Sequence, residues 1–464
     1  MPRRTATLNY LLGLCLAASL CAAAGGQARA ADQRPNLLFV LIDDLRWNAL
    51  GCMGHPFVKT PHIDRIAREG ALFRNAFVTL PLCSPSRASF LTGQYAHRNG
   101  IRDNTNRGPR SHELITFPRL LQKAGYETAY IGKWHMGNDD TPRPGFDRWV
   151  SFKGQGVYQD CPLNVDGQPQ KSAGYITDVL TDRTVEFLRR KHDRPFCVTL
   201  AHKAIHGPFT PAPRHAELYA NDPIQRTPGC RDTNEGKPVL TRPVTNPMGR
   251  ALPPARPGGG SGDMLIRNQL RCLASIDEGV GRVLDALRET GQLDRTMVVF
   301  TSDNGYFWGE HGLGDKRAAY EEALRIPMLV RYPPLAKAGS EVREAVLNVD
   351  LAPTFLELGG AAIPEEVQGR SFADLLRGRA RDWRASALFE YFEERQFPRI
   401  PTWQAVRSAR WKYIHYPAVE NADELYDLQA DPDELHNRIR DAAAAGALQE
   451  LKAELERLAP KDQG

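Results

Sequence analysis

The sequence predicts an α/β fold, in which helices sandwich a large mixed, mostly parallel sheet and a small antiparallel α+β unit follows. The chain has 464 residues, which is enough for a large core. Continuous apolar runs such as Asn36 to Ile42 show no alternation, as in strands that are buried on both faces. Beyond Arg370, short strand-like runs follow one another without helices between them, which is typical of an antiparallel unit.

The first thirty residues have the features of a secretory signal peptide. Arg3 and Arg4 form a basic start, residues 11–24 are apolar, and Ala28-Arg29-Ala30 fits a cleavage site. The apolar run is too short to predict a membrane span, and the arginine pair leaves twin-arginine export open. We expect an exported, periplasmic or extracellular protein with a signal peptide at 1–30, a large domain at 31–375 and a C-terminal subdomain at 376–464.

The net charge gives no indication of a nucleic-acid-binding surface. The formal charge is +5 at pH 7, and removal of residues 1–30, which hold three arginines and no acidic residue, lowers it by three. A nearly neutral protein attracts anionic substrates only through local charge. We therefore expect neither a nucleic-acid partner nor a membrane partner.

The eight cysteines indicate neither a dense disulfide framework nor a zinc site. Cys15 and Cys21 lie in the predicted signal peptide, and Cys21 leaves a lipid anchor open. Apart from Cys83, which is treated below, the other five have no CxxC spacing. One or two disulfides among them are compatible with the sequence, and their pairing is open: Cys52, Cys161, Cys197, Cys230 and Cys272.

Periodicity and composition predict the elements of the chain in order. Amphipathic patterns with capping residues predict helices at 60–72, 116–123, 177–191 and 264–290. Apolar runs predict further strands at 126–131, 196–200, 297–300 and 326–332. Residues 140–175 and 221–262 are rich in Pro and Gly and predict loops, the first at a pocket rim and the second either beside the pocket or as a surface insertion. The C-terminal unit has predicted strands at 387–391, 404–408, 411–416 and 424–428 and a helix at 442–458.

Two of the expected strands end in paired oxygen-bearing side chains. Asp43 and Asp44 follow the strand that ends at Ile42, and Asp303 and Asn304 follow a later strand. In open α/β sheets, ligands bind at the carboxyl ends of the strands. Hard oxygen donors select calcium or magnesium over zinc, and flexible carboxylate and amide ligands favour calcium. A helix N-cap beside a solvated acid is the simpler alternative for the first pair.

Basic side chains gather at other strand ends and in one loop. Lys133 and His135 follow the second strand and, two residues apart in an extended chain, face the same side. His202 and His206 follow the next strand, and Lys316 lies in a charged loop that glycines interrupt. Each residue alone is compatible with a surface lysine or a packed histidine, but their shared position favours a site.

The stretch from Leu82 to Gln94 has the most specific pattern in the chain, LCSPSRASFLTGQ. Pro85 sets a backbone φ that suits the first turn of a helix. Cys83 then lies at a helix N-terminus, where backbone N–H groups and the helix dipole favour anions. Arg87 lies one turn further and can share this anion site. The arrangement suits a tetrahedral oxyanion, and a buried structural cysteine is the alternative.

This stretch resembles the signature of the sulfatase family, C/S-x-P-x-R followed by a Thr-Gly pair. Cys83, Pro85, Arg87 and Leu91 to Gly93 match, whereas Gln94 replaces the basic residue of many members. The resemblance implies that a formylglycine-generating enzyme oxidises Cys83 to formylglycine, whose hydrate attacks sulfur. It also implies the fold of the alkaline phosphatase superfamily, with the catalytic domain at 31–375.

The resemblance covers nearly the whole mature chain and implies individual roles. It implies that Ca²⁺ binds Asp43, Asp44, Cys83, Asp303 and Asn304. The implied catalytic residues are Cys83, Arg87, Lys133, His135, His206 and Lys316. Asp303 would accept a proton from the nucleophile, and His135 would accept the proton whose loss expels sulfate. His206 would protonate the leaving oxygen with help from Lys316, and His202 is the competing candidate.

Residues 156–164 and 310–317 resemble stretches of sulfatases that act on sulfated sugars, including glucosamine 6-sulfatases of heparan-type glycans. We therefore expect a sulfatase that hydrolyses a sulfate ester on a glycosaminoglycan-type carbohydrate, with 6-O-sulfated glucosamine favoured. Two alternatives stay open. One is a phosphonate or phosphate diester hydrolase of the same superfamily, and the other is a non-catalytic glycan-binding protein in which Cys83 stays a thiol.

Overall fold

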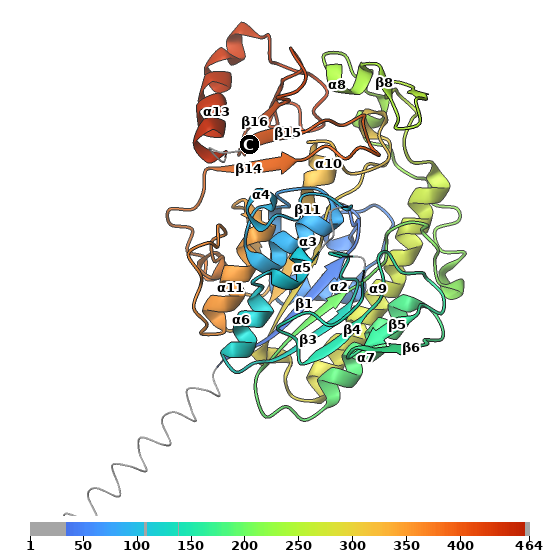
Figure 1. Cartoon of the computed structure of the whole chain (residues 1–464), viewed down its shortest axis with the longest axis vertical. Helices are drawn as coiled ribbons and strands as arrows, with labels where there is room; N and C mark the ends of the chain where they lie inside the picture. The colour runs from blue at the N-terminus through green and yellow to red at the C-terminus, as the bar shows by residue number, and fades with distance from the viewer. Residues whose placement is uncertain (1–33, 106–108, 138, 460–464) are drawn as a thin grey trace, which may run out of the picture.

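The chain folds into a layered α/β unit with a separate four-stranded sheet at one end (Figure 1). The computed structural model describes residues 34–105, 109–137 and 139–459. Among these residues, the large sheet has eleven strands in the order β12-β2-β11-β10-β1-β7-β3-β4-β5-β6, and β13 pairs with β2. Its strands are β1 Asn36–Ile42, β2 Ala71–Phe77, β3 Glu127–Gly132, β4 Arg148–Ser151, β5 Leu163–Val165, β6 Gln168–Gln170, β7 Phe196–Ala201, β10 Thr296–Ser302, β11 Arg325–Arg331, β12 Ser340–Val342 and β13 Val346–Leu347.

The centre of this sheet is parallel, because β10, β1, β7, β3 and β4 all run in one direction. Antiparallel pairing flanks it on both sides. β11 lies between β10 and β2 on one side, and β5 lies between β4 and β6 on the other. The prediction of a large mixed, mostly parallel sheet is confirmed.

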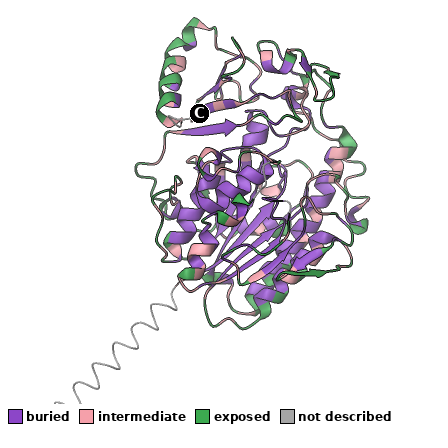
Figure 2. Cartoon of the chain, viewed as in Figure 1, coloured by how far each residue is buried: buried purple, intermediate pink, exposed green. Residues whose placement is uncertain are grey.

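The central strand β1 shows why its sequence lacks polar alternation. All seven of its residues are buried, because helices cover both faces of the sheet. Side chains of residues 38, 40 and 42 join one core cluster, and those of residues 37, 39 and 41 join another. Figure 2 shows the sheet buried between these layers.

Three main helices supply each layer. The first layer contains α2 Pro61–Arg68, α7 Ile176–Arg189 and α9 Asp263–Glu289. The second contains α3 Cys83–Thr92, α6 Phe117–Lys123 and α11 Leu351–Leu358. Shorter helices are α4 Ala96–Asn99, α5 Arg110–Glu113, α8 Pro238–Thr241, α10 Glu321–Leu324 and α12 Ala373–Leu376.

The C-terminal unit is an antiparallel sheet covered by one helix, as predicted. β14 Ser386–Tyr391, β15 Trp403–Ser408, β16 Trp411–His415 and β17 Glu424–Asp427 pair in that order. Helix α13 Ala445–Leu458 contributes Leu451 and Leu455 to a small core with residues of all four strands. The domain boundary between residues 375 and 376 stays a prediction.

The local structure differs from two of the predicted segments, 60–72 and 140–175. The helix expected at 60–72 ends at Arg68, and β2 begins at Ala71. A Cβ on Gly70 would lie 2.1 Å from the carbonyl oxygen of Val330, so only glycine allows the chain to turn this close to β11. Residues 140–175, predicted as a loop, contain β4, β5 and β6, because tertiary pairing orders short strands whose own sequences give little signal.

The Pro-rich stretch 221–262 is largely irregular, as predicted. Besides short helical turns, it forms only a two-residue hairpin, β8 Val244–Thr245 with β9 Ala251–Leu252. The predicted signal peptide at 1–30 lies outside the described residues. In the described ranges, no helix has the length and apolarity that a membrane span needs. The cysteines described there are all free: Cys52, Cys83, Cys161, Cys197, Cys230 and Cys272.

Candidate active site

The register of two adjacent parallel strands brings the predicted oxygen ligands together. Ile42 at the end of β1 lies opposite Ser302 at the end of β10. The backbone N–H of Asp303 donates to the Ile42 carbonyl at 2.9 Å. Both chains therefore leave the sheet at the same edge, and their next residues are the four that the sequence singled out.

These residues form a compact buried group with Cys83. One ligand atom from each of Asp43, Asp44, Cys83 and Asp303 lies within 4.8 Å of the others, and all four residues are buried. Asn304 donates from Nδ2 to Asp44 at 2.7 Å, but its buried Oδ1 has no hydrogen-bond partner among the described residues. A buried amide oxygen without a partner is costly, so this oxygen and the carboxylates fit a hard divalent cation. 

Three buried cationic side chains surround the carboxylates. Arg87 donates from Nε to Asp303 at 2.8 Å, and one of its terminal nitrogens lies 3.5 Å from Asp43. Lys133 pairs with Asp43, and Lys316 pairs with Asp44. The same terminal nitrogen of Arg87, Nη2, makes no hydrogen bond within the described chain, so an incoming anion can accept one from it.

The pKa shifts of the two acids in this group follow from burial and neighbouring charge. Burial alone raises the pKa of Asp43, but Lys133, with help from His206, Arg87 and Lys316, lowers it well below its usual range. Burial and then the charge of Asp43 raise the pKa of Asp303 to about 7. Asp43 therefore stays ionised at neutral pH, whereas Asp303 can accept a proton there.

Cys83 is the first residue of α3, and its side chain faces this group. Its Sγ lies 3.5 Å from Asp43, and the side chain is fully buried. Burial and then the negative charge of Asp43 raise the pKa of the thiol far above its usual value. The unmodified thiol thus stays protonated and is a poor nucleophile, since the thiolate is the reactive form.

The four predicted basic residues beyond β3 and β7 take different positions. Lys133 and His135 both reach the site, as predicted. The predicted reason was wrong, because His135 has a left-handed φ of 62° and the segment is not an extended strand in which alternate side chains face the same side. His206 lies with Nε2 3.9 Å from Asp44. His202 is fully buried, does not line the pocket, and neither ring nitrogen has a hydrogen-bond partner in the described part of the chain.

The charged group opens into a hollow of about 780 Å³, which Asp44, His135, His206 and Lys316 help to line. The sequence singled out none of the wall residues from the C-terminal unit, Glu394, Gln396 and Phe397, because no motif marks this loop between two strands. The wall also contains Asn104, Phe209, Tyr306, Asp315 and Arg317. Arg317 donates to Glu394 at 2.6 Å and lies over the Phe397 ring, so residues from both units build one wall.

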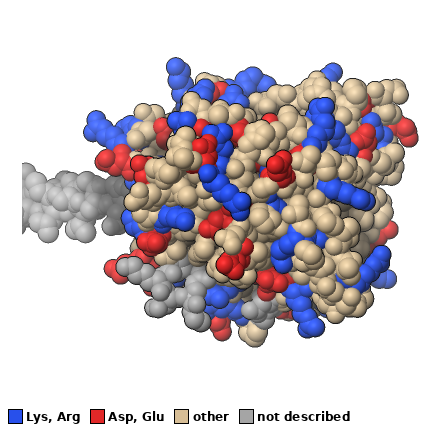
Figure 3. All heavy atoms as spheres, turned by 90° about the horizontal axis from the view of Figure 1, so that it is seen from above, with Lys and Arg blue, Asp and Glu red and all other residues tan. Residues whose placement is uncertain are grey.

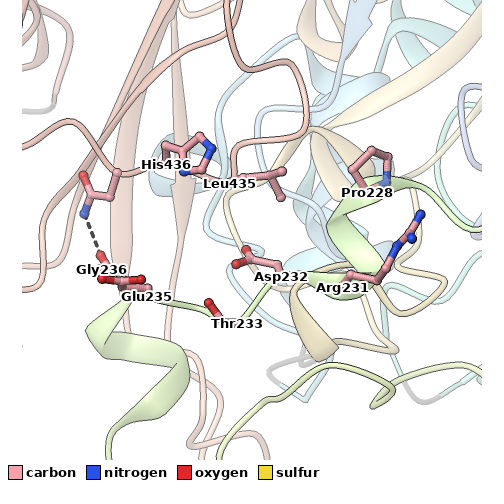
Figure 4. A pocket seen from close by; sticks show the side chains of 9 residues that line it. Pro228, Arg231, Asp232, Thr233, Glu235, Gly236, Leu435 and His436 are labelled. Carbon is pink, nitrogen blue, oxygen red and sulfur yellow. Dashed lines mark hydrogen bonds between the residues drawn. The ribbon is translucent and has the colours of Figure 1, made fainter.

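A second hollow of about 610 Å³ lies apart from this site (Figure 4). Arg231, Asp232 and Glu235 from one side face Leu435 and His436 of the C-terminal unit across it. None of the predicted site residues lines it. Figure 3 shows acidic and basic side chains interspersed over one face of the molecule, without a continuous field of either sign.

Comparison with known proteins decides the family. The model of a family described as Sulfatase matches residues 35–361, and a model described as N-sulphoglucosamine sulphohydrolase, C-terminal, matches residues 309–461. The chain belongs to the sulfatase family. It is a sulfuric ester hydrolase, as predicted, and the prediction of an enzyme is confirmed.

Two curated sulfatases are similar over most of their length. N-acetylglucosamine-6-O-sulfatase of Bacteroides thetaiotaomicron is 34% identical, with 96% of this chain and 89% of that protein covered. Human N-acetylglucosamine-6-sulfatase is 31% identical, with 88% and 81% covered.

Two solved structures share the sulfatase fold. One, described as a complex with its substrate D-glucosamine-2-N,6-O-disulfate, has a TM-score of 0.83 at 34% identity and covers 91% of this chain and 97% of its own. A phosphonate monoester hydrolase from Silicibacter pomeroyi has a TM-score of 0.74 at 26% identity, with 91% and 95% covered. The fold class is confirmed by both.

The buried Arg87 should stabilise the folded sulfatase when no divalent cation is present. In buffer with a chelator, Arg87→Met leaves Asp43 and Asp303 without one of their counterions, which should cost about 3–5 kcal/mol. The measurement is the midpoint of thermal unfolding. Arg410→Met is the matched control, because Arg410 pairs with Asp427 at the surface and its loss should matter far less. Equal shifts for the two variants would contradict the interpretation of the buried cluster.

Proposed function

We propose that this sulfatase removes the 6-O-sulfate from glucosamine residues of a glycosaminoglycan-type carbohydrate. The observation that carries the proposal is the buried group of Asp43, Asp44 and Asp303 with Cys83 and Arg87, which opens into a hollow of about 780 Å³. That volume is in the range of small-molecule sites. Two similar proteins are named N-acetylglucosamine-6-O-sulfatase and N-acetylglucosamine-6-sulfatase, which supports this choice of sugar.

The walls of the hollow suit a sugar. Asp315, Arg317 and Glu394 offer charged hydrogen-bonding groups for hydroxyls, and Phe209 and Phe397 offer aromatic surface. A pyranose can use both kinds of group, because its hydroxyls require hydrogen-bond partners and its ring carbons form apolar faces.

We infer that Ca²⁺ is the bound cation and that Asp43, Asp44, Asp303, Asn304 and position 83 hold it. When bound, this ion offsets the negative charge of the sulfuryl oxygens. We also infer that Cys83 is converted to formylglycine by a maturing enzyme, and the hydrated aldehyde then supplies the nucleophilic oxygen. The fully buried, protonated thiol supports this, since it is unreactive as it stands.

Three residues of the chain bind the sulfate monoester. Arg87 offers Nη2, which makes no hydrogen bond within the described residues, and Lys133 and Lys316 lie at the carboxylates on either side. Negative charge grows on the transferring group during the reaction, and fixed cations stabilise that charge more than they stabilise the bound substrate. These side chains are held by buried ion pairs and need little rearrangement when the substrate binds.

Proton transfers fall to Asp303 and two histidines. Asp303 accepts the proton of the attacking oxygen, because its carboxylate lies beside position 83 in the buried group. Burial and then Lys133 lower the pKa of His206 to about 4, so the ring is neutral without substrate. A bound sulfate ester raises this pKa through its negative charge, and His206 then donates a proton to the leaving alcohol. His135 accepts the proton whose loss releases sulfate and restores the aldehyde.

We propose that the sulfatase is exported to the periplasm or to the extracellular medium, where it can reach sulfated glycans. The sequence of residues 1–30 supports this proposal, and one curated relative is described as an extracellular sulfatase homolog.

A panel of defined sulfated sugars tests the function. The enzyme from its native host should release sulfate from N-acetylglucosamine 6-sulfate with a higher kcat/KM than from galactose 6-sulfate, N-acetylgalactosamine 4-sulfate or an aryl phosphodiester. Peptide mass spectrometry should find the mass of the Cys83 peptide lowered by conversion to formylglycine. A preference for the phosphodiester would make the protein a diesterase, and an unmodified but active enzyme would contradict the nucleophile.

His206 and His202 offer a direct comparison of two histidines on one segment. His206→Ala should lower kcat on the 6-sulfated sugar by roughly 10²–10⁴-fold, the usual contribution of a general acid. His202→Ala removes a buried ring that does not line the pocket, so it should lower stability and leave kcat of the folded enzyme little changed. The reverse pattern would exchange their roles.

Calcium should bind to the folded protein in the absence of substrate. At about 100 times its dissociation constant, Ca²⁺ should add about 2.7 kcal/mol to the free energy of unfolding, measured as a rise in the thermal midpoint. Asn304→Ala should reduce this rise, because it removes the Oδ1 that lacks a partner in the described chain. The control Asn99→Ala removes a buried amide elsewhere in the protein and should leave the Ca²⁺-dependent rise in the thermal midpoint unchanged. An unchanged rise in Asn304→Ala would exclude this ligand.

A further inference from the structure

The segment that carries His206 is fixed on one side to a metal-site carboxylate residue. The backbone N–H of Asp43 donates to the Ala204 carbonyl at 3.1 Å, and that of Ile205 donates to the Asp43 carbonyl at 2.9 Å. This pairing sets the distance between the segment and the metal group. It does not reach His206 itself, whose own N–H donates to the Lys203 carbonyl at 3.1 Å.

Two buried side chains hold the other side of this segment. The Tyr158 hydroxyl donates to the His206 carbonyl at 2.6 Å. The Lys203 ammonium donates to the Gly207 carbonyl at 2.8 Å and lies 4.7 Å from the centre of the Tyr158 ring. Two successive carbonyls, those of His206 and Gly207, are therefore held by a linked pair of donors.

The contacts of the imidazole add a further constraint. His206 Nδ1 lies 3.1 Å from the Gly207 carbonyl, a contact that requires a proton on Nδ1. Nε2 is then the nitrogen that faces Asp44 and the pocket. Lys203 and Nδ1 donate to the same carbonyl oxygen, so the position of this oxygen sets the direction of the ring.

Packing alone does not require these polar groups. Tyr158 and Lys203 are almost completely buried, and burial lowers the pKa of Lys203 to about 8. An apolar side chain would fill the same volume without the cost of burying an ammonium group. The groups face carbonyls of the catalytic segment, which indicates that their role is to place it.

We propose that Tyr158 and Lys203 are positioning residues that hold the His206–Gly207 backbone, so that His206 Nε2 points at the leaving oxygen. This inference rests on the proposed role of His206 as the general acid. Because Nδ1 already holds one proton, Nε2 carries a proton only in the imidazolium form that the bound sulfate ester favours. In that step the bond between sulfur and the bridging oxygen breaks, its electron pair stays on the oxygen, and the Nε2 proton of the imidazolium passes to that oxygen, which leaves His206 neutral. A bond between sulfur and the nucleophilic oxygen forms at the same time.

The dependence on the leaving group tests the proposal, because only a poor leaving group needs a well-placed acid. Tyr158→Phe should lower kcat on N-acetylglucosamine 6-sulfate by roughly tenfold with little change in KM, the effect of one lost hydrogen bond. On 4-nitrophenyl sulfate, whose phenolate leaves without a proton, kcat should change far less. Lys203→Met, which keeps the length of the side chain, should show the same contrast between the two substrates.

Tyr175→Phe is the matched control. The Tyr175 ring stacks on Tyr158 with centroids 5.6 Å apart, and its hydroxyl donates at 3.0 Å to the carbonyl of Thr210, four residues beyond His206. Tyr175 is as buried as Tyr158, so Tyr175→Phe should lower stability as much as Tyr158→Phe does. Its effect on kcat should be the same for the sugar sulfate and for 4-nitrophenyl sulfate. An equal contrast in Tyr175→Phe, or equal losses on both substrates in Tyr158→Phe, would overturn the positioning role.

A double-mutant cycle separates failure of this inference from failure of the proposed function. If Tyr158 acts through His206, Tyr158→Phe should have no further effect on kcat in the His206→Ala background. Additive losses would overturn the inference and leave the role of His206 intact. A His206→Ala enzyme with full activity on the sugar would instead overturn the proposed general acid. Thermal midpoints and the formylglycine content of every variant show that folded, matured enzyme is compared.

Discussion

The structure depends on placing three carboxylates against one another with almost no exposure to solvent. Asp43, Asp44 and Asp303 are fully or almost fully buried, and like charges this close oppose one another. Such a group is stable only with cations beside it. Arg87, Lys133 and Lys316 supply that charge from three different parts of the chain. The layered sheet has to bring these parts of the chain together. The fold therefore meets the requirement of the site that its buried carboxylates have cations beside them.

The same requirement explains why the site suits an anionic ester. Cations that are held by buried carboxylates are fixed in direction, and a sulfuryl group that enters the pocket meets donors already in position. Cys83 lies at the same place because α3 begins there, and burial, followed by the negative charge of Asp43, keeps its thiol protonated. Burial and Asp43 oppose the thiolate more strongly than Lys316 and Lys133 favour it, which agrees with a nucleophile other than sulfur.

The small C-terminal unit is part of the pocket. Glu394 accepts a hydrogen bond from Arg317 and lies in the wall beside Phe397, which precedes β15. Asn104, in turn, accepts a hydrogen bond from the N–H of Ser84, next to the nucleophile position. The reacting centre belongs to the large sheet, whereas the wall that a sugar would contact is shared between the two units. Changes in the loop before β15 can therefore alter the substrate without altering the chemistry.

The sequence by itself determined the fold class, and it singled out the residues of the proposed reacting centre, because both leave local marks. Apolar runs identified β1, β7 and β10, and the Cys83 to Arg87 pattern identified the start of α3. Only the tertiary structure decided which side chains share a pocket. Two histidines follow β7, yet only His206 reaches the pocket, because pairing with Asp43 and the contacts of Tyr158 turn the segment. The wall residues of the C-terminal unit and the strand β2 gave no local signal, since long-range packing alone gives them their roles.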